Sequence, residues 1–154
     1  MTSRVIANDQ LRAHDDPMTN TTATTSSSTL APTTTLDVMV DTHLRAYCEP
    51  DPGTRAELLA AVWAPTGTLI DPPFDGEGLD AIAAMVDVVL THYAGHTFRR
   101  TTAIDAHHTF GRYEWELVGP DGVVAVAGTD IVEIDDDGRL KRIVGFFGPL
   151  ASAA

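Results

Sequence analysis

The hydrophobic period of the chain changes once, near Gly95. Between residues 36 and 93 apolar side chains recur every three or four positions, which is the spacing of one face of an α-helix. From Thr97 onward apolar and polar residues alternate, as they do in strands that bury one face. We therefore expect helices first and an antiparallel sheet afterwards, an α+β architecture.

Three helices are expected before this change. The first spans residues 36–49 and stops at Pro50, because proline lacks the N–H that would continue a helix. The second opens at Thr54 with a capping box of the form Ser/Thr-x-x-Glu and ends before Pro65. The third covers residues 79–93, where apolar residues keep a helical spacing throughout.

Strands are expected around and after the third helix. Turn sequences rich in Gly and Asp, at residues 119–122 and 135–138, separate the last three strands. The alternation places Asp130 on the same strand face as the neighbouring valines, so this carboxylate is expected to point inward. The expected strands are residues 68–71, 97–104, 107–118, 123–134 and 139–147.

A segment without hydrophobic period precedes the first helix. Between Thr19 and Thr35 twelve of seventeen residues are Ser or Thr. Such a segment cannot bury enough apolar surface to offset the entropy lost on ordering. We expect residues 1–35 to form a disordered tail and residues 36–150 to form one folded domain.

Composition disfavours several classes of partner. The formal net charge of −12 disfavours binding to nucleic acids and to anionic membranes. Cys48 is the only cysteine, so neither an internal disulfide nor a cysteine-based zinc site is expected. No apolar run has the length of a secretory signal or a membrane span, and we expect a soluble, cytoplasmic protein.

Two carboxylates stand in apolar surroundings. Asp71 ends the expected strand at residues 68–71, and Asp130 lies within the apolar run at residues 123–132. A charged carboxylate in such a place must find a partner, take up a proton or do chemistry. If both face one cavity, one can act as an acid while the other acts as a base. Structural roles stay open, with Asp71 as a turn opener and Asp130 bonded to the backbone or to His43.

The order of elements resembles the superfamily of nuclear transport factor 2-like proteins, which includes SnoaL-like polyketide cyclases and ketosteroid isomerase. The resemblance covers residues 36–150, and its strongest parts are residues 63–72, 78–85 and 130–140. It implies a cystatin-like α+β cone, in which three N-terminal helices pack in the concave face of a curved, mostly antiparallel sheet. It also implies a homodimer that forms through the outer face of the sheet.

The resemblance also assigns roles to particular residues. Laid along ketosteroid isomerase, Asp71 corresponds to the proton-shuttling aspartate and Asp130 to the acid that hydrogen-bonds the developing enolate. The oxyanion tyrosine of that enzyme corresponds to His43, and its two supporting tyrosines correspond to Val86 and Trp63. The tyrosine network is therefore absent, and steroid isomerisation itself is not expected.

Histidine and aromatic residues complete the expected site. His43 lies on the apolar face of the first helix, either as a proton-transfer group or as an ordinary core histidine. His107 and His108 are not expected to hold a metal, because adjacent strand residues point to opposite faces unless a bulge realigns them. The expected substrate-binding residues, for which ordinary core packing is the alternative, are Trp63, Phe74, Val86, Tyr113, Trp115 and Phe147.

The sequence predicts a cofactor-independent acid/base enzyme of isomerase, cyclase or dehydratase type that acts on a hydrophobic, oxygenated small molecule. Asp71 is the predicted general base, Asp130 the acid or hydrogen-bond donor, and His43 an auxiliary donor. One alternative is a non-catalytic module of the same fold that binds a small molecule or a protein. Another is an epoxide hydrolase, which would have an Asp-Arg-Asp relay inside the pocket. Arg112 and Arg142 are expected to point outward, which counts against this alternative. Neither a metal nor an organic cofactor is expected.

Overall fold

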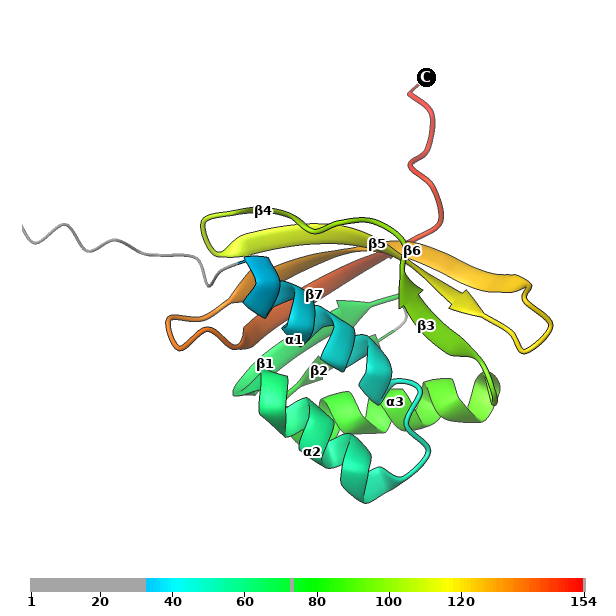
Figure 1. Cartoon of the computed structure of the whole chain (residues 1–154), viewed down its shortest axis with the longest axis horizontal. Coiled ribbons are helices and arrows are strands. Elements are labelled where there is room, and N and C mark those ends of the chain that lie inside the picture. The colour runs from blue at the N-terminus through cyan, green and yellow to red at the C-terminus, as the bar shows by residue number, and fades with distance from the viewer. Residues whose placement is uncertain (1–32, 73, 154) are drawn as a thin grey trace, which may run out of the picture.

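A computed structural model describes residues 33–72 and 74–153 of the chain. In this part, three helices lie against one face of a curved sheet of seven strands (Figure 1). All strand pairs are antiparallel except the pair formed by the first and the last strand. The expected α+β cone is confirmed. Most of the predicted tail, residues 1–32, lies outside the described residues.

All three predicted helices form, but their ends differ from the prediction, and the first ends at Ala46 rather than at residue 49. Helix α1 (Thr33–Ala46) begins inside the predicted tail. Helix α2 (Pro52–Val62) begins earlier than expected, because Asp51 is its N-cap and accepts a 2.8 Å hydrogen bond from the backbone N–H of Thr54. The prediction that a capping box at Thr54 opens this helix was therefore wrong. Helix α3 (Leu79–His92) ends one residue before the predicted limit.

The sheet contains a hairpin that the sequence analysis missed. Strand β1 (Trp63–Asp71) includes Pro65, which was interpreted as a helix stop, and continues through a tight turn into β2 (Phe74–Glu77). Proline is tolerated there because the pairing of β1 with its neighbour is irregular between Trp63 and Thr68. The remaining strands are β3 (Thr97–Arg100), β4 (Asp105–His107), β5 (Phe110–Val118), β6 (Val124–Ile134) and β7 (Leu140–Phe147).

The order of strands across the sheet is β2-β1-β7-β6-β5-β3, and β4 pairs with the other half of β5. The strand predicted at residues 97–104 is shorter than expected, because β3 ends at Arg100, and β4 (Asp105–His107) is a separate short strand that begins after the predicted range. Strand β7 lies between β1 and β6, the two strands that carry the isolated aspartates. This order decides where the two carboxylates meet.

The core fills the space between the helices and the concave face of the sheet. The predicted alternation in β5 is confirmed, since Tyr113, Trp115 and Leu117 are buried while Arg112 and Glu114 are exposed. The inward residues of β6 and β7 join the same core as α1 and α3. The core members with no measurable exposure are Val40, Trp63, Ile82, Val86, Val132, Leu140 and Ile143, together with Ala46.

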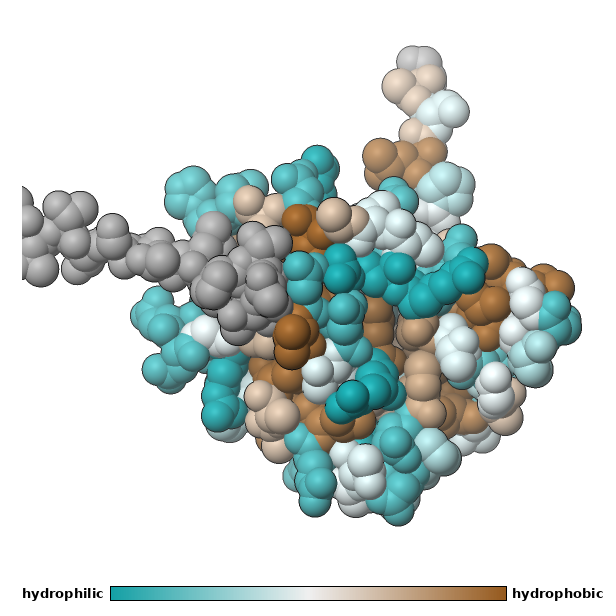
Figure 2. Space-filling model, viewed as in Figure 1, coloured by the Kyte–Doolittle hydropathy of each residue, from teal (hydrophilic) through white to brown (hydrophobic). Residues whose placement is uncertain are grey.

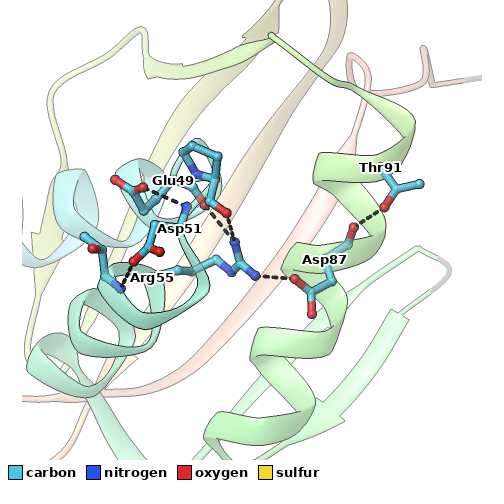
Figure 3. A network of polar contacts seen from close by, with 7 residues as sticks. Glu49, Asp51, Arg55, Asp87 and Thr91 are labelled. Atoms are coloured by element: carbon cyan, nitrogen blue, oxygen red, sulfur yellow. Dashed lines mark hydrogen bonds and ion pairs between the residues drawn. The ribbon is translucent and has the colours of Figure 1, made fainter.

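A buried arginine fastens the helices to one another. Arg55 of α2 donates a 2.8 Å hydrogen bond to the carbonyl of Glu49 and forms an ion pair with Asp87 of α3 (Figure 3). Its guanidinium therefore holds the loop after α1 against α3. None of the three described helices has the length and apolar composition needed to cross a bilayer.

Candidate active site

Asp71 and Asp130 meet above a glycine on the strand between them. Asp71 ends β1, one residue after Ile70, which pairs with Val144 of β7. Asp130 of β6 pairs directly with Gly145 of β7. A Cβ atom on Gly145 would lie 1.9 Å from Oδ1 of Asp71 and 3.1 Å from Oδ1 of Asp130, so these oxygens are at most about 5 Å apart, the two distances laid end to end. Only glycine leaves room for both carboxyl groups.

Two donors on β5 hold the carboxyl group of Asp130. The hydroxyl of Tyr113 donates to Oδ2 at 2.8 Å, and the indole N–H of Trp115 donates to Oδ1 at 2.7 Å. The indole can cross the sheet because Gly128 stands opposite it, where a Cβ would lie 2.6 Å from the ring. Asp130 is thereby fixed in position, and the alternative partner His43 is not used.

Asp71 is held less tightly. Its Oδ1 is buried and has no hydrogen-bond partner among the described residues. A buried acceptor without a partner costs free energy, and this cost is recovered when a ligand or a proton satisfies the oxygen. Asp71 is therefore the more available base of the pair.

Burial shifts the pKa of both carboxyl groups upward. Desolvation raises the pKa of Asp71 to about 6, and the backbone of Gly145 offsets part of the effect. Desolvation, followed by repulsion from Asp71, raises the pKa of Asp130 to about 7, although the hydrogen bonds from Trp115 and Tyr113 favour its charged form. Near neutral pH the two carboxyl groups therefore titrate as a coupled pair that can share one proton.

The two carboxyl groups line one small cavity of about 50 Å³. Ligand pockets commonly measure hundreds of Å³, so this space holds only a compact molecule without rearrangement. The candidate catalytic residues Asp71, Asp130 and His43 all lie on its wall, as do Phe74, Trp115 and Phe147 from the predicted binding set. The other lining residues, which the sequence analysis did not assign to the site, are Leu44, Tyr47, Met85, Val89 and Phe98.

Three residues of the predicted binding set do not line the cavity. Trp63 and Val86 are completely buried in the core, and Tyr113 is buried beneath the carboxyl group that it binds. Trp63 and Val86 were placed by correspondence to the tyrosines of another enzyme, but their apolar side chains pack with the helices. Their contribution to the site is therefore support of neighbouring side chains.

Trp63 fixes the tautomer of His43. The indole N–H of Trp63 donates to Nδ1 of His43 at 3.2 Å, and an indole nitrogen is only a donor. Nδ1 must therefore be unprotonated, and the proton of the neutral ring is on Nε2. Burial lowers the pKa of His43 to about 3, so the imidazole stays neutral across the physiological range. His43 is thus a neutral hydrogen-bond donor rather than a cationic acid.

Tyr47 was missed because it was interpreted as a core residue of the first helix. It lies one helical turn after His43, and the two rings meet edge to face with centroids 5.1 Å apart. Burial, and then the charges of Asp71 and Asp130, raise the pKa of the phenol well above 10.0. The i, i+4 spacing from His43 was the signal that could have identified it.

The two adjacent histidines are arranged differently from the prediction. His108 has a φ of 54° in the turn after β4, which brings its ring beside that of His107, with the two Nδ1 atoms 3.2 Å apart. The argument that their side chains point to opposite faces was wrong, because it assumed regular strand geometry. Within residues 33–72 and 74–153 no group of three or more His, Cys, Asp or Glu side chains is arranged to hold a metal ion.

The arginines expected to point outward do so. Arg112 pairs with Asp105 and Arg142 with Glu133 on the outer face of the sheet, where both arginine side chains are exposed. The described wall of the cavity includes no arginine. An Asp-Arg-Asp relay, the basis of the epoxide hydrolase alternative, therefore finds no arginine at this site.

Comparison with solved structures identifies related proteins. A candidate isomerase of the SnoaL-like family from Agrobacterium tumefaciens is 34% identical, with a TM-score of 0.71 over 75% of this chain and 99% of that chain. A candidate polyketide cyclase from Sinorhizobium meliloti is 17% identical, with a TM-score of 0.58 over 73% and 98% of the two chains.

A third neighbour, from Catenulispora acidiphila, has a ketosteroid isomerase-like fold and is in complex with trimethylamine; it is 13% identical, with a TM-score of 0.58 over 70% and 83% of the chains. At this identity the likeness concerns the fold alone. A scan against models of known protein families and a search of curated protein sequences both found no match.

Proposed function

The chain belongs to the SnoaL-like family, and on that premise we propose that it is a cofactor-independent acid/base enzyme of isomerase, cyclase or dehydratase type. The observation that carries the proposal is the pair of carboxyl groups at Gly145, of which one is fixed by two donors and the other has a buried oxygen without a hydrogen-bond partner. Groups with pKa values of about 6 and about 7 suit proton transfer near neutral pH.

The proposed reaction moves a proton between two carbon atoms. Asp71, as the carboxylate, removes a proton from the carbon next to a carbonyl group, and the electron pair moves onto the carbonyl oxygen. Donors on the cavity wall stabilise this oxyanion: protonated Asp130, the hydroxyl of Tyr47 and the Nε2–H of His43. Asp71 then returns the proton to a second carbon, which completes an isomerisation. In a dehydration, the enolate instead expels the β-hydroxyl group, which takes the proton from Asp71 and leaves as water.

The cavity limits which substrates this mechanism serves. Its volume of about 50 Å³ suits an oxygenated compound with few non-hydrogen atoms rather than a steroid. Phe74 and Phe147 lie at its edge, since both are partly exposed, and their rings provide apolar contact. We expect activity to fall as substrates become larger than one small ring.

A small enone tests the proposal directly. Conversion of cyclopent-3-enone to cyclopent-2-enone, followed by NMR with deuterium incorporation, reports removal and return of the α-proton. We expect Asp71→Asn to abolish enzymatic conversion while circular dichroism shows an intact fold. Asp75→Asn is the matched control, because Asp75 is exposed on β2 and does not line the cavity.

Two outcomes would contradict the proposal. Wild-type rates from Asp71→Asn would remove the base assignment. Binding of small ketones without proton exchange in any of them would favour the non-catalytic module, in which ligands raise the melting temperature but are released unchanged.

We further propose that the enzyme is a cytoplasmic homodimer that pairs through the outer face of the sheet. Ile131 and Phe146 are exposed on this face, beside a groove of about 950 Å³. Figure 2 shows further apolar surface at the end of the β5–β6 hairpin, where Val123 is exposed. Light scattering should give twice the monomer mass, and Phe146→Glu should halve it; a monomeric wild-type protein would contradict the pairing.

A further inference from the structure

The cavity is unbalanced in charge. Two carboxyl groups reach it, but its described wall includes neither lysine nor arginine. His43 stays neutral, and the phenols of Tyr47 and Tyr113 stay protonated because burial raises their pKa values. The described wall of the cavity therefore offers no positively charged side chain to an ionised Asp71.

The rest of the wall is aromatic. Trp115 lies at the centre, with the rings of Phe98 and Phe147 against it at centroid distances of 5.2 and 5.7 Å. Tyr47 packs on the other side of Phe98 at 5.3 Å. Aromatic faces attract cations, most strongly where water is excluded, and they also accept alkyl groups.

From this combination we propose that the cavity binds compact alkylammonium cations, with the nitrogen near the unpartnered oxygen of Asp71 and the alkyl groups against the aromatic rings. The inference concerns the site of the proposed enzyme and rests on the proposed function. It names a class of ligand for that site, a small substrate or inhibitor with an ammonium group. The volume of about 50 Å³ limits such a cation to a few non-hydrogen atoms.

The affinity should depend on pH through the carboxyl pair. The cation binds the ionised pair best, so binding should weaken as the pH falls from about 8 to about 5 and protons occupy the carboxyl groups. Among the groups that face the pair, His43 of α1, Tyr47 directly after α1 and Tyr113 of β5 remain neutral in this range. Binding should therefore release a fraction of a proton.

The test compares trimethylammonium chloride with tert-butanol, a neutral molecule of nearly the same shape. Both are titrated into the full-length protein at constant ionic strength, with NMR shifts and calorimetry as readouts. We expect the cation to bind at least roughly tenfold more tightly than the alcohol at pH 8, and to lose this advantage at pH 5. Asp71→Asn should remove the preference, whereas Asp75→Asn should keep it.

Equal affinity for the two molecules, or an unchanged preference in Asp71→Asn, would overturn the inference. The enone assay separates it from the proposed function. Enone conversion that depends on Asp71, without cation binding, refutes the ammonium ligand and leaves the enzyme proposal intact. Cation binding without enone conversion, and without proton exchange in any small ketone, refutes the enzyme proposal and supports the ammonium site.

Discussion

The indole N–H of Trp115 lies 2.7 Å from Oδ1 of Asp130, although the two residues are not cross-strand partners. The partner of Trp115 is Gly128, and the missing side chain there lets the indole lie across β6 and reach the carboxyl group. Trp115 therefore belongs to the wall of the cavity and also orients the acid that it binds.

Replacing Trp115 with phenylalanine should keep the apolar wall and remove one donor from Asp130. The hydrogen bond favours the charged carboxylate, so its loss should raise the pKa of Asp130 above about 7 and cost about 1–3 kcal/mol of stability at pH 8. Carboxyl NMR titration and urea denaturation measure the two effects. Tyr113→Phe is the matched variant, since it removes the donor to the other oxygen.

Asp71→Asn should stabilise the protein, but only above about pH 4. The folded state raises the pKa of Asp71 from 3.8 to about 6, so between these values it binds a proton that the unfolded chain has released. Stability is therefore lost as the pH rises through this window, and removing the carboxyl group recovers roughly 1–3 kcal/mol at pH 8 but almost nothing at pH 3.5. Thermal melts at both values measure this, and equal melting temperatures for variant and wild type at pH 8 would contradict it.

The pH profile of enone conversion should be a narrow bell. The rate rises as Asp71 loses its proton near pH 6 and falls as Asp130 loses its own near pH 7. Because the two groups interact, both limbs belong to the pair rather than to single residues. A kcat/KM series from pH 4 to 9 measures the profile, and a rate that still rises above pH 8 would exclude Asp130 as the acid.

Gly145→Ala should reduce activity more than stability. The added methyl would lie 1.9 Å from Oδ1 of Asp71, so the carboxyl group must swing away from Asp130. The φ of Gly145 is not positive, so alanine is allowed in the strand. We expect kcat to fall at least roughly tenfold with retained circular dichroism. Gly53→Ala, on an exposed helix turn, is the control, and full activity from Gly145→Ala would contradict the geometry.

Arg55→Met should destabilise the protein without changing the chemistry of the site. The change removes the ion pair with Asp87 and leaves the carbonyls of Glu49 and Pro50 without their donor (Figure 3). We expect a loss of about 2–4 kcal/mol in urea denaturation. Asp87→Asn should cost less than about 1 kcal/mol because Asp87 is exposed; an equal cost for both variants would place the effect in the ion pair alone.

The sequence was sufficient wherever one period governed a long segment. The alternation of β6 predicted that Asp130 points inward, and the structure buries it with Val132 and Ile134. The spacing of apolar residues located α3 within one residue. Both features follow from the burial of one face of a long element, which requires apolar residues at regular spacing in the sequence.

The sequence was insufficient where a local signal was ambiguous and where two distant segments determined the geometry. Asp51 was not recognised as the cap of α2, because Thr54 offered a competing signal. The short β1–β2 hairpin has little period of its own, and the position of Pro65 suggested the end of a helix. The donors to Asp130 and the contact of Tyr47 with His43 depend on packing across elements, which periodicity does not record.

The placement of β7 between β1 and β6 has a consequence for biosynthesis. A ribosome makes Asp71 and Asp130 before it makes Gly145, so a nascent chain contains both acids while the strand that brings them together is still missing. Pairing of β1 with β7 closes a loop of some seventy residues, a contact that forms slowly compared with hairpins. The proton-transfer pair should consequently be among the last features to form, after translation has passed the final strand.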